Sequence, residues 1–173
     1  LAFKYRNPAM ILTDGLIGQM MEKVELPPQK ERLKDFDQSW VITGKTPDRE
    51  RNIITSLNLI ADLQYDHNLK LQEKYRQMEE DVMFEKIECD DAEFILIAYG
   101  SSARICQKVV EIARGRGKKI GLLRPKTLFP FPAKAIARLA RRAKGMMSVE
   151  LSAGQMVEDV KLAVNGKVPV YHY

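Results

Sequence analysis

The sequence predicts an α/β fold, with a mostly parallel sheet flanked by helices and preceded by a fragment of a second α/β domain. Two observations lead to this prediction. Short apolar segments alternate with amphipathic segments over residues 93–171, and strands joined by helical crossovers run parallel. A separate helix–strand–helix pattern occupies residues 1–22. The chain is therefore expected to contain one nearly complete sheet and part of another.

The amino-terminal segment has the pattern of a sheet fragment. Leu1–Arg6 is typical of the last turns of a helix, which ends at Asn7-Pro8 because proline disfavours helical backbone in the preceding residue. The apolar run Ala9–Thr13 predicts a parallel strand buried on both faces, and Leu16–Glu22 opens another helix. Since such a fragment cannot close a sheet alone, we expect this chain to be the carboxy-terminal part of a longer polypeptide.

A long connection follows and leads into a predicted surface helix. Val24–Asn52 is polar, contains Pro27-Pro28 and is longer than connections within compact domains, so we expect it to link two domains. Trp40 is expected to anchor this linker by burying its ring, and stacking on a ligand is the alternative. Residues 66–85 predict a helix packed by a single stripe, formed by Leu71, Tyr75, Met78 and Val82.

The remaining residues predict a regular series of strands and helices. Gly115 and Gly117 end the first of these helices, in which Cys106 is expected to be a packed thiol. Pro169 places the last strand at a sheet edge, because proline cannot donate a ladder hydrogen bond. The expected strands are 93–99, 119–123, 145–150 and 168–171, and the helices are 100–114, with Ile105, Val109 and Ile112 on one face, 133–143 and 151–164.

Composition limits the classes of function. The chain is 45% hydrophobic and 29% charged, which is typical of a globular protein, and no apolar run reaches the roughly 18 residues of a membrane span. Cys89 and Cys106 form no CxxC pair and have no nearby histidine, so no iron–sulfur or zinc site is predicted. A reducing cytoplasm is the expected location. The net charge of +5 permits phosphate or nucleic-acid partners without requiring them.

Three loops are candidate sites, because ligands of such sheets bind beyond the carboxyl ends of the strands. In the first, Gly100, Ser101 and Ser102 offer hydroxyls and backbone N–H groups at a helix start, which suit a phosphate or carboxylate, and Arg104 is close by. Ordinary helix capping by Ser101 or Ser102 explains the same residues. The other two loops are 124–132 and 152–155. No dinucleotide or P-loop motif is present.

The arginines and lysines have alternative interpretations. Arg104 and Arg124 could contact a ligand, but we favour a role at a subunit interface. Two basic clusters at helix ends are explained by the helix dipole, and no interleaved aromatic residue supports nucleic-acid binding. His67 and His172 lack a nearby nucleophile motif, so no residue is predicted to be catalytic. The basic clusters are Arg114, Arg116, Lys118 and Lys119, and Arg138, Arg141, Arg142 and Lys144.

Four longer strings carry a family resemblance. They are NPAMILTDGLIGQMMEKVELPP (7–28), CDDAEFILIAYGSSARICQKVVEIAR (89–114), GLLRPKTLFPFP (121–132) and SVELSAGQMVEDVKLAVNGKVPVY (148–171). With them, the chain resembles the carboxy-terminal half of the alpha subunit of 2-oxoacid:ferredoxin oxidoreductases, most closely the 3-methyl-2-oxobutanoate (ketoisovalerate) type.

The resemblance implies part of an enzyme complex that converts a branched-chain 2-oxoacid to acyl-CoA and CO2, with ferredoxin as electron acceptor. It implies thiamine diphosphate, Mg2+, iron–sulfur clusters and coenzyme A for the complex, and none bound by this segment. The expected partners are a thiamine diphosphate-binding beta subunit, a gamma subunit and a ferredoxin-like delta subunit, in a dimer of heteromers without nucleic acid or membrane.

The resemblance also divides the chain. Residues 1–25 would be the tail of a thiamine-pyrimidine-binding domain, 26–65 a linker, and 66–173 a helix plus a domain like the carboxy-terminal one of transketolase. The glutamate that activates thiamine in such enzymes would precede Leu1. This segment is then expected to be inactive alone and to scaffold assembly, with Arg124, Gln155 and Glu158 at interfaces. The alternative is a phosphate- or coenzyme A-binding module that uses Gly100–Arg104.

Overall fold

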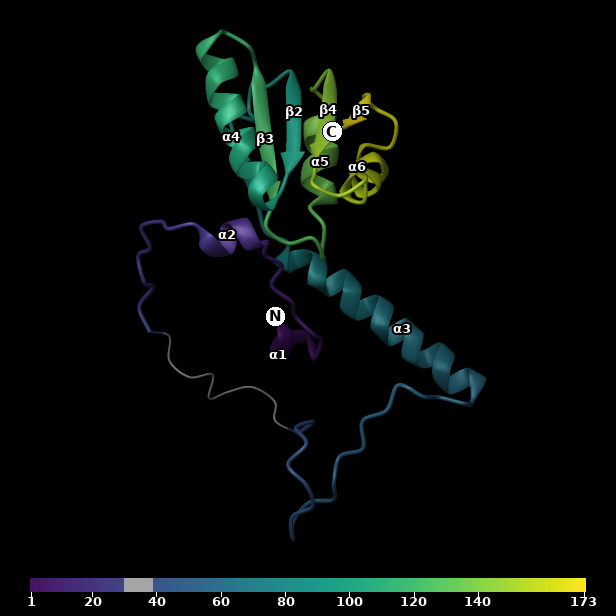
Figure 1. Ribbon diagram of the computed structural model, residues 1–173. Helices are drawn as coiled ribbons and strands as arrows, with labels where there is room; N and C mark the ends of the chain where they lie inside the picture. Colours follow the sequence, from purple (N-terminus) through teal and green to yellow (C-terminus); the bar gives the residue numbers. More distant parts are fainter. Residues whose placement is uncertain (30–38) are drawn as a thin grey trace. The chain divides into compact units, whose positions relative to one another are not determined.

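The computed structural model describes residues 1–29 and 39–173 (Figure 1). Residues 30–38, within the predicted linker, lie outside the described residues. The chain divides into two units. The larger unit combines Leu12–Met21 with Gln77–Tyr173, and the smaller one combines Leu1–Ile11 with Glu22–Arg76.

The larger unit is built on a five-stranded sheet with the order β1-β3-β2-β4-β5. β2, β3, β4 and β5 are mutually parallel, while β1 is antiparallel to β3. The predicted fold class, α/β with a mostly parallel sheet flanked by helices, is confirmed. The strands are β1 (Phe84–Ile87), β2 (Phe94–Ala98), β3 (Ile120–Pro125), β4 (Gly145–Val149) and β5 (Val170–His172).

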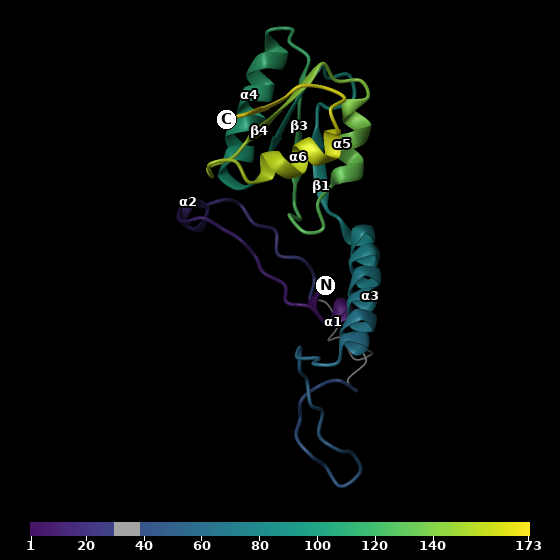
Figure 2. The ribbon, with the colours of Figure 1, turned by 90° about the vertical axis from the view of Figure 1, so that its right-hand side faces the viewer.

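Helices cover both faces of the sheet (Figures 1 and 2). α4 (Gly100–Gly115) packs on one face, and α5 (Ala133–Ala140) and α6 (Met156–Val164) pack on the other. Successive strand residues point to opposite faces, so the sheet contributes to two cores. Ile95, Ile97, Leu123, Ile136, Met146 and Val160 belong to the core beneath α5 and α6, and Ala98, Cys106, Val110 and Leu122 belong to the core beneath α4.

Two details of α4 follow from this packing. Cys106 is buried, as predicted, and burial raises the pKa of its thiol. Ile105, Val109 and Ile112 share one face of the helix, but that face is exposed to between 44% and 63%. The helix therefore packs by its small residues and Cys106 rather than by its largest apolar side chains.

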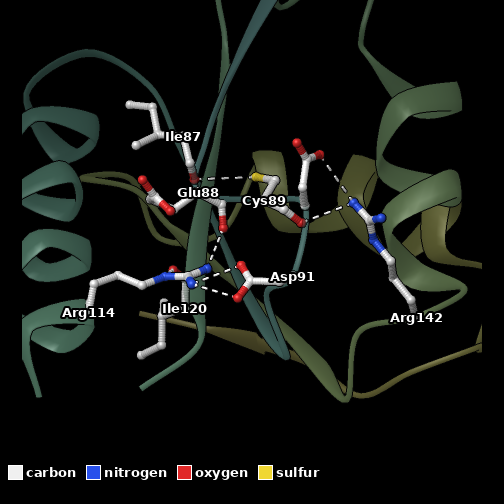
Figure 3. Close-up of polar contacts among 8 residues, drawn as sticks. Ile87, Glu88, Cys89, Asp91, Arg114, Ile120 and Arg142 are labelled. Atoms are coloured by element: carbon white, nitrogen blue, oxygen red, sulfur yellow. Dashed lines mark hydrogen bonds and ion pairs between the residues drawn. The ribbon is translucent and has the colours of Figure 1, made fainter. Parts of the chain in front are cut away.

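The amino-terminal edge of the parallel strands is fixed by two arginines (Figure 3). Arg114, at the end of α4, donates to the carbonyls of Glu88 (2.6 Å) and Ile120 (2.8 Å) and pairs with Asp91. Arg142 donates to the carbonyl of Cys89 (3.0 Å) from the other side of the β1–β2 loop. These contacts satisfy two carbonyls of the β1–β2 loop and one at the start of β3, so one arginine of each predicted basic cluster binds the chain's own backbone.

β1 was not predicted, because the helical stripe was expected to continue to residue 85. Instead, α3 (Ala61–Met78) ends at Met78, which is buried, and a 3-10 turn (Glu79–Asp81) leads into β1. Val82 is half-buried beyond the helix. The antiparallel pairing of β1 with β3 therefore replaces the last helical turn.

The smaller unit has little regular structure besides α1 (Ala2–Tyr5) and most of α3. α1 ends before Asn7-Pro8, as predicted, and Lys74 of α3 donates to the side chain of Asn7 (3.2 Å). Trp40 is half-buried beside Phe3 and beneath the Arg6 guanidinium, so the predicted anchor is only partly buried.

The prediction of a buried strand over Ala9–Thr13 is wrong. These residues form no strand, and Met10 and Ile11 are 81% and 94% exposed. An apolar run forms a buried strand only beside other strands, and none of the described residues pairs with this one. The helix predicted after it is α2 (Gly15–Gln19), which is capped by Asp14.

Candidate functional site

The sheet changes the direction of its connections between β2 and β4. The chain leaves β2 through α4 toward β3, and it leaves β4 through α6, on the opposite face, toward β5. The carboxyl ends of two such neighbouring strands form a crevice, which is the usual ligand position in open α/β sheets. All three loops predicted as candidate sites follow carboxyl ends of strands at this edge.

A cavity of about 190 Å³ lies at this crevice. Tyr99 contributes from the end of β2, and the loop after β3 and the start of α6 supply the remaining walls. Its lining combines apolar side chains with an amide and a carboxylate, and consists of Tyr99, Leu128, Phe131, Gln155, Met156 and Asp159.

The N-terminus of α6 is occupied by a carboxylate of this chain. Glu150 is only 7% exposed, and it accepts hydrogen bonds from the Ser152 hydroxyl (2.6 Å) and the backbone N–H of Met156 (2.9 Å). Burial alone would raise the pKa of Glu150, but these hydrogen bonds hold it below its usual value. Further donors are Ser148, Gln155 and Val157. The loop 152–155 therefore uses the Ser152 hydroxyl and the Gln155 N–H on Glu150.

The start of α4 is arranged in a similar way. Ser101 is buried, and its hydroxyl donates to the carboxylate of Asp14 (2.5 Å). The backbone N–H of Ile17 also donates to Asp14 (2.7 Å), and the two bonds hold the Asp14 pKa below its usual value. Two anions from the chain thus take hydrogen-bond donors at the edge where an external anion was expected.

The predicted capping of α4 by a serine is wrong. The N-cap residue is Tyr99, and its side chain makes no capping hydrogen bond. α4 begins at Gly100, whose positive φ of 56° favours glycine, so Ser101 and Ser102 lie inside the first turn. Both serines are buried and Arg104 is exposed.

The predicted interface residues lie in different places. Gln155 lines the cavity, and Glu158 is exposed in the first turn of α6. Arg124 lies on β3, and its guanidinium is 3.6 Å from the carboxylate of Glu85 on the neighbouring strand β1. Of the three, Gln155 alone lines the cavity with Tyr99 at the crevice between the carboxyl ends of β2 and β4, which we call the switch point.

Sequence reasoning missed the two carboxylates that organise this edge. Asp14 had a recognisable signal, because an aspartate before a helix start is a common N-cap. Glu150 had a weaker one, since a carboxylate directly after a strand precedes a loop with free N–H groups. Phe131 lies in the candidate loop 124–132 but was not singled out there, and Asp159 lay outside the three loops; the fold places both around one cavity.

Residues 1–29 and 39–173 contain neither a cluster of metal-ligating side chains nor a helix that could span a membrane. In that part of the chain, no three or more His, Cys, Asp or Glu side chains are grouped so that they could hold a metal ion. None of its helices has both the length and the apolar character needed to cross a lipid bilayer.

Comparisons with known proteins agree on one family. Residues 92–173 match the family described as pyruvate:ferredoxin oxidoreductase core domain II. The chain is 44% identical over 164 residues to the ketoisovalerate oxidoreductase subunit VorB of Methanothermobacter thermautotrophicus, covering 94% of this chain and 46% of that protein. It is 31% identical to the 2-oxoglutarate synthase subunit KorA of Archaeoglobus fulgidus, covering 93% and 46%. The chain thus spans about half the length of these relatives.

A solved structure supports the fold. The 2-oxoglutarate:ferredoxin oxidoreductase from Magnetococcus marinus, solved with 2-oxoglutarate, coenzyme A and succinyl-CoA bound, aligns with a TM-score of 0.57 at 20% identity. The alignment covers 73% of this chain and 24% of that one. From the matches in sequence, the chain is homologous to subunits of 2-oxoacid:ferredoxin oxidoreductases, and its residues 92–173 match core domain II.

Proposed function

We propose that the chain is part of a subunit of a complex that oxidatively decarboxylates a branched-chain 2-oxoacid to acyl-CoA and CO2, with ferredoxin as electron acceptor. The observation that carries this proposal is the 44% identity to a ketoisovalerate oxidoreductase subunit over 94% of the chain. The identity to a 2-oxoglutarate synthase subunit is lower, at 31%, which favours the branched-chain substrate.

Within that complex, we propose that this segment scaffolds assembly. In the smaller unit, Met10, Ile11, Leu26 and Leu59 are each more than 80% exposed. Exposed apolar side chains in such numbers are typical of surfaces that other polypeptide covers. Residues 1–25 would then complete a thiamine-pyrimidine-binding domain, 26–65 would link it, and 66–173 would form the transketolase-like domain.

The residues of this segment do not fit the cofactors of the reaction. A diphosphate needs free donors at a helix start. At α6, the backbone N–H groups of Gln155, Met156 and Val157 donate to Glu150, and at α4 the hydroxyl of Ser101 donates to Asp14. Among residues 1–29 and 39–173, no three or more His, Cys, Asp or Glu side chains are grouped as a metal site built from protein ligands alone would require. We therefore assign thiamine diphosphate, Mg2+, the clusters and coenzyme A to other parts of the complex. At Gly100–Arg104, the Ser101 hydroxyl is already bound to Asp14, which counts against the use of this hydroxyl in a phosphate- or coenzyme A-binding module.

The test is an anaerobic assay of the full-length subunit co-expressed with the products of its neighbouring genes. We expect coenzyme A-dependent reduction of a viologen dye, fastest with 3-methyl-2-oxobutanoate among a panel of 2-oxoacids. A complex that contains thiamine diphosphate and clusters but reduces the dye with no oxoacid would refute the proposal. Faster reduction with 2-oxoglutarate or pyruvate would refute only the branched-chain assignment.

A further inference from the structure

We propose that the cavity at the switch point is an anchor pocket that receives an arginine or lysine side chain from another subunit of the complex. The proposal rests on the proposed function, because it requires a multi-subunit assembly. Beyond the proposed function, it names the site on this chain that a partner subunit contacts and the type of side chain that the partner supplies.

The size of the cavity suits a side chain. Its volume of about 190 Å³ is smaller than the roughly 300 to 1,000 Å³ of pockets for drug-sized ligands and cofactors. A single long side chain of a partner protein needs less room. The site is therefore better suited to an anchor residue than to a nucleotide or coenzyme A.

The charge of the cavity selects a cation. Asp159 lines it with an exposed carboxylate, and among the described residues this carboxylate has no ion-pair or hydrogen-bond partner. Glu158 adds a second exposed carboxylate in the same helical turn, in a chain whose net charge is +5. The three backbone N–H groups at the start of α6 donate to Glu150, so they are not available to an external anion at the cavity. An incoming group that carries positive charge is thus favoured.

The walls of the cavity suit the stem of such a side chain. Leu128, Phe131 and Met156 provide apolar contacts for the methylene groups of arginine or lysine, whose charged head would reach Asp159. Arginine fits better than lysine, because its planar guanidinium binds a carboxylate through two hydrogen bonds and stacks on an aromatic ring.

The surroundings indicate a protein rather than a free amine. Phe129, which lies in sequence between the lining residues Leu128 and Phe131, is 65% exposed, and Leu151, in the loop between β4 and α6, is 80% exposed. A small pocket beside exposed apolar side chains is the usual arrangement around a binding hot spot, where neighbouring contacts exclude water from the anchor. A free amine would leave both apolar side chains uncovered.

The first experiment places a photocrosslinking amino acid at Gln155 in the full-length subunit, co-expressed with the products of its neighbouring genes. The Gln155 side chain is exposed, and its backbone N–H keeps its bond to Glu150 after substitution. We expect a crosslink to a peptide of another subunit that contains arginine or lysine. A crosslink only to a second copy of this subunit, or to no subunit of a purified complex, would overturn the proposal.

The second experiment compares Asp159→Arg with the control Glu111→Arg in the same full-length subunit. Glu111 is an exposed carboxylate on α4, away from the cavity lining, and circular dichroism checks that both variants fold. We expect Asp159→Arg to weaken retention of the partner subunits about tenfold or more, and the control to retain them. Equal retention by both variants refutes the anchor pocket. If that complex still oxidises 2-oxoacids, the proposed function stands.

Discussion

The carboxylate of Glu150 accepts hydrogen bonds from two hydroxyls and three backbone N–H groups around the start of α6. The Nε2 atom of His172 lies 3.6 Å from the same carboxylate. The side chain thus does within the chain what a bound anion does in many α/β proteins. Its ionisation is therefore coupled to the stability of the fold.

We predict a pH-dependent loss of stability when Glu150 is replaced. Because its pKa is lower in the folded chain, Glu150 stabilises the fold fully above its unfolded value near 4.5. That contribution is lost as the pH falls through the lowered folded pKa. Urea unfolding of the chain and of Glu150→Gln from pH 7 to pH 3 should show a difference that shrinks below about pH 4.5.

The comparison is repeated in a His172→Gln background, which removes the histidine that faces Glu150. If the unfolding free energies of the chain and of its Glu150→Gln variant differ by a constant amount from pH 7 to pH 3, the coupling is contradicted.

Gly121 is a second residue on which the packing of its surroundings depends. A Cβ atom at this position would lie 2.6 Å from the carbonyl oxygen of Glu88 and 2.9 Å from the Cα of Cys89. Both are backbone atoms of the loop that the two arginines hold, so neither can move aside without breaking those contacts. We predict that Gly121→Ala costs about 1 to 3 kcal/mol of unfolding free energy.

The matched control is Gly115→Ala, where a Cβ meets no atom within 4 Å. Urea unfolding should show little change or a small gain for this variant. Equal losses of unfolding free energy in both variants would mean that the loss comes from the reduced backbone freedom of alanine and not from the close approach of the Glu88 and Cys89 backbone to Gly121.

At the scale of elements, Arg114 connects α4, β3 and the β1–β2 loop. Its guanidinium binds two carbonyls and a carboxylate in different directions, which lysine cannot reproduce with one ammonium group. We predict that Arg114→Lys lowers the unfolding free energy by roughly 1 to 3 kcal/mol, measured by urea unfolding. Arg116→Lys, at an exposed position just beyond the helix, should change it little. An unchanged unfolding free energy for Arg114→Lys would show that a positive charge at this position stabilises the fold as well as the guanidinium does.

The elements of the sheet were predictable where local pattern determines them. Strands β2 to β5 and helices α4 to α6 have apolar periods and glycine or proline boundaries that a short window of sequence reveals. Phe84–Ile87 has two charged residues in four, and its strand depends on pairing with β3, which is distant in sequence. Ala9–Thr13 has the apolar pattern of a strand without a partner strand.

The site was less predictable than the fold. Its loops were located, because strand order and strand ends fix the carboxyl edge. The binding partners of those loops were not, since the Ser101–Asp14 bond and the cavity that Tyr99 lines together with the start of α6 bring together residues far apart in sequence. A serine at a helix start has the same local signal whether its hydroxyl meets a ligand or an aspartate of its own chain.

At the scale of the whole molecule, regular structure is concentrated in the larger unit. Residues 39–60 contain no helix or strand, and a single pair of backbone hydrogen bonds joins Thr46 and Arg49. We predict that trypsin cleaves the native chain first after Lys45 and Arg51, which are exposed, and leaves a resistant fragment that includes residues 77–173. Mass spectrometry of a time course identifies the cuts. First cuts between residues 94 and 149 would show that the sheet opens as easily as this segment.

The bond between Ser101 and Asp14 joins residues that are 87 positions apart. Closing a loop of that length costs chain entropy, while β2, α4 and β3 form from contacts close in sequence. α2, with five residues, is too short to persist without tertiary support. The formation of α2 is therefore a late step in refolding. The time at which the backbone N–H of Ile17 becomes protected from hydrogen exchange then marks the completion of the native structure.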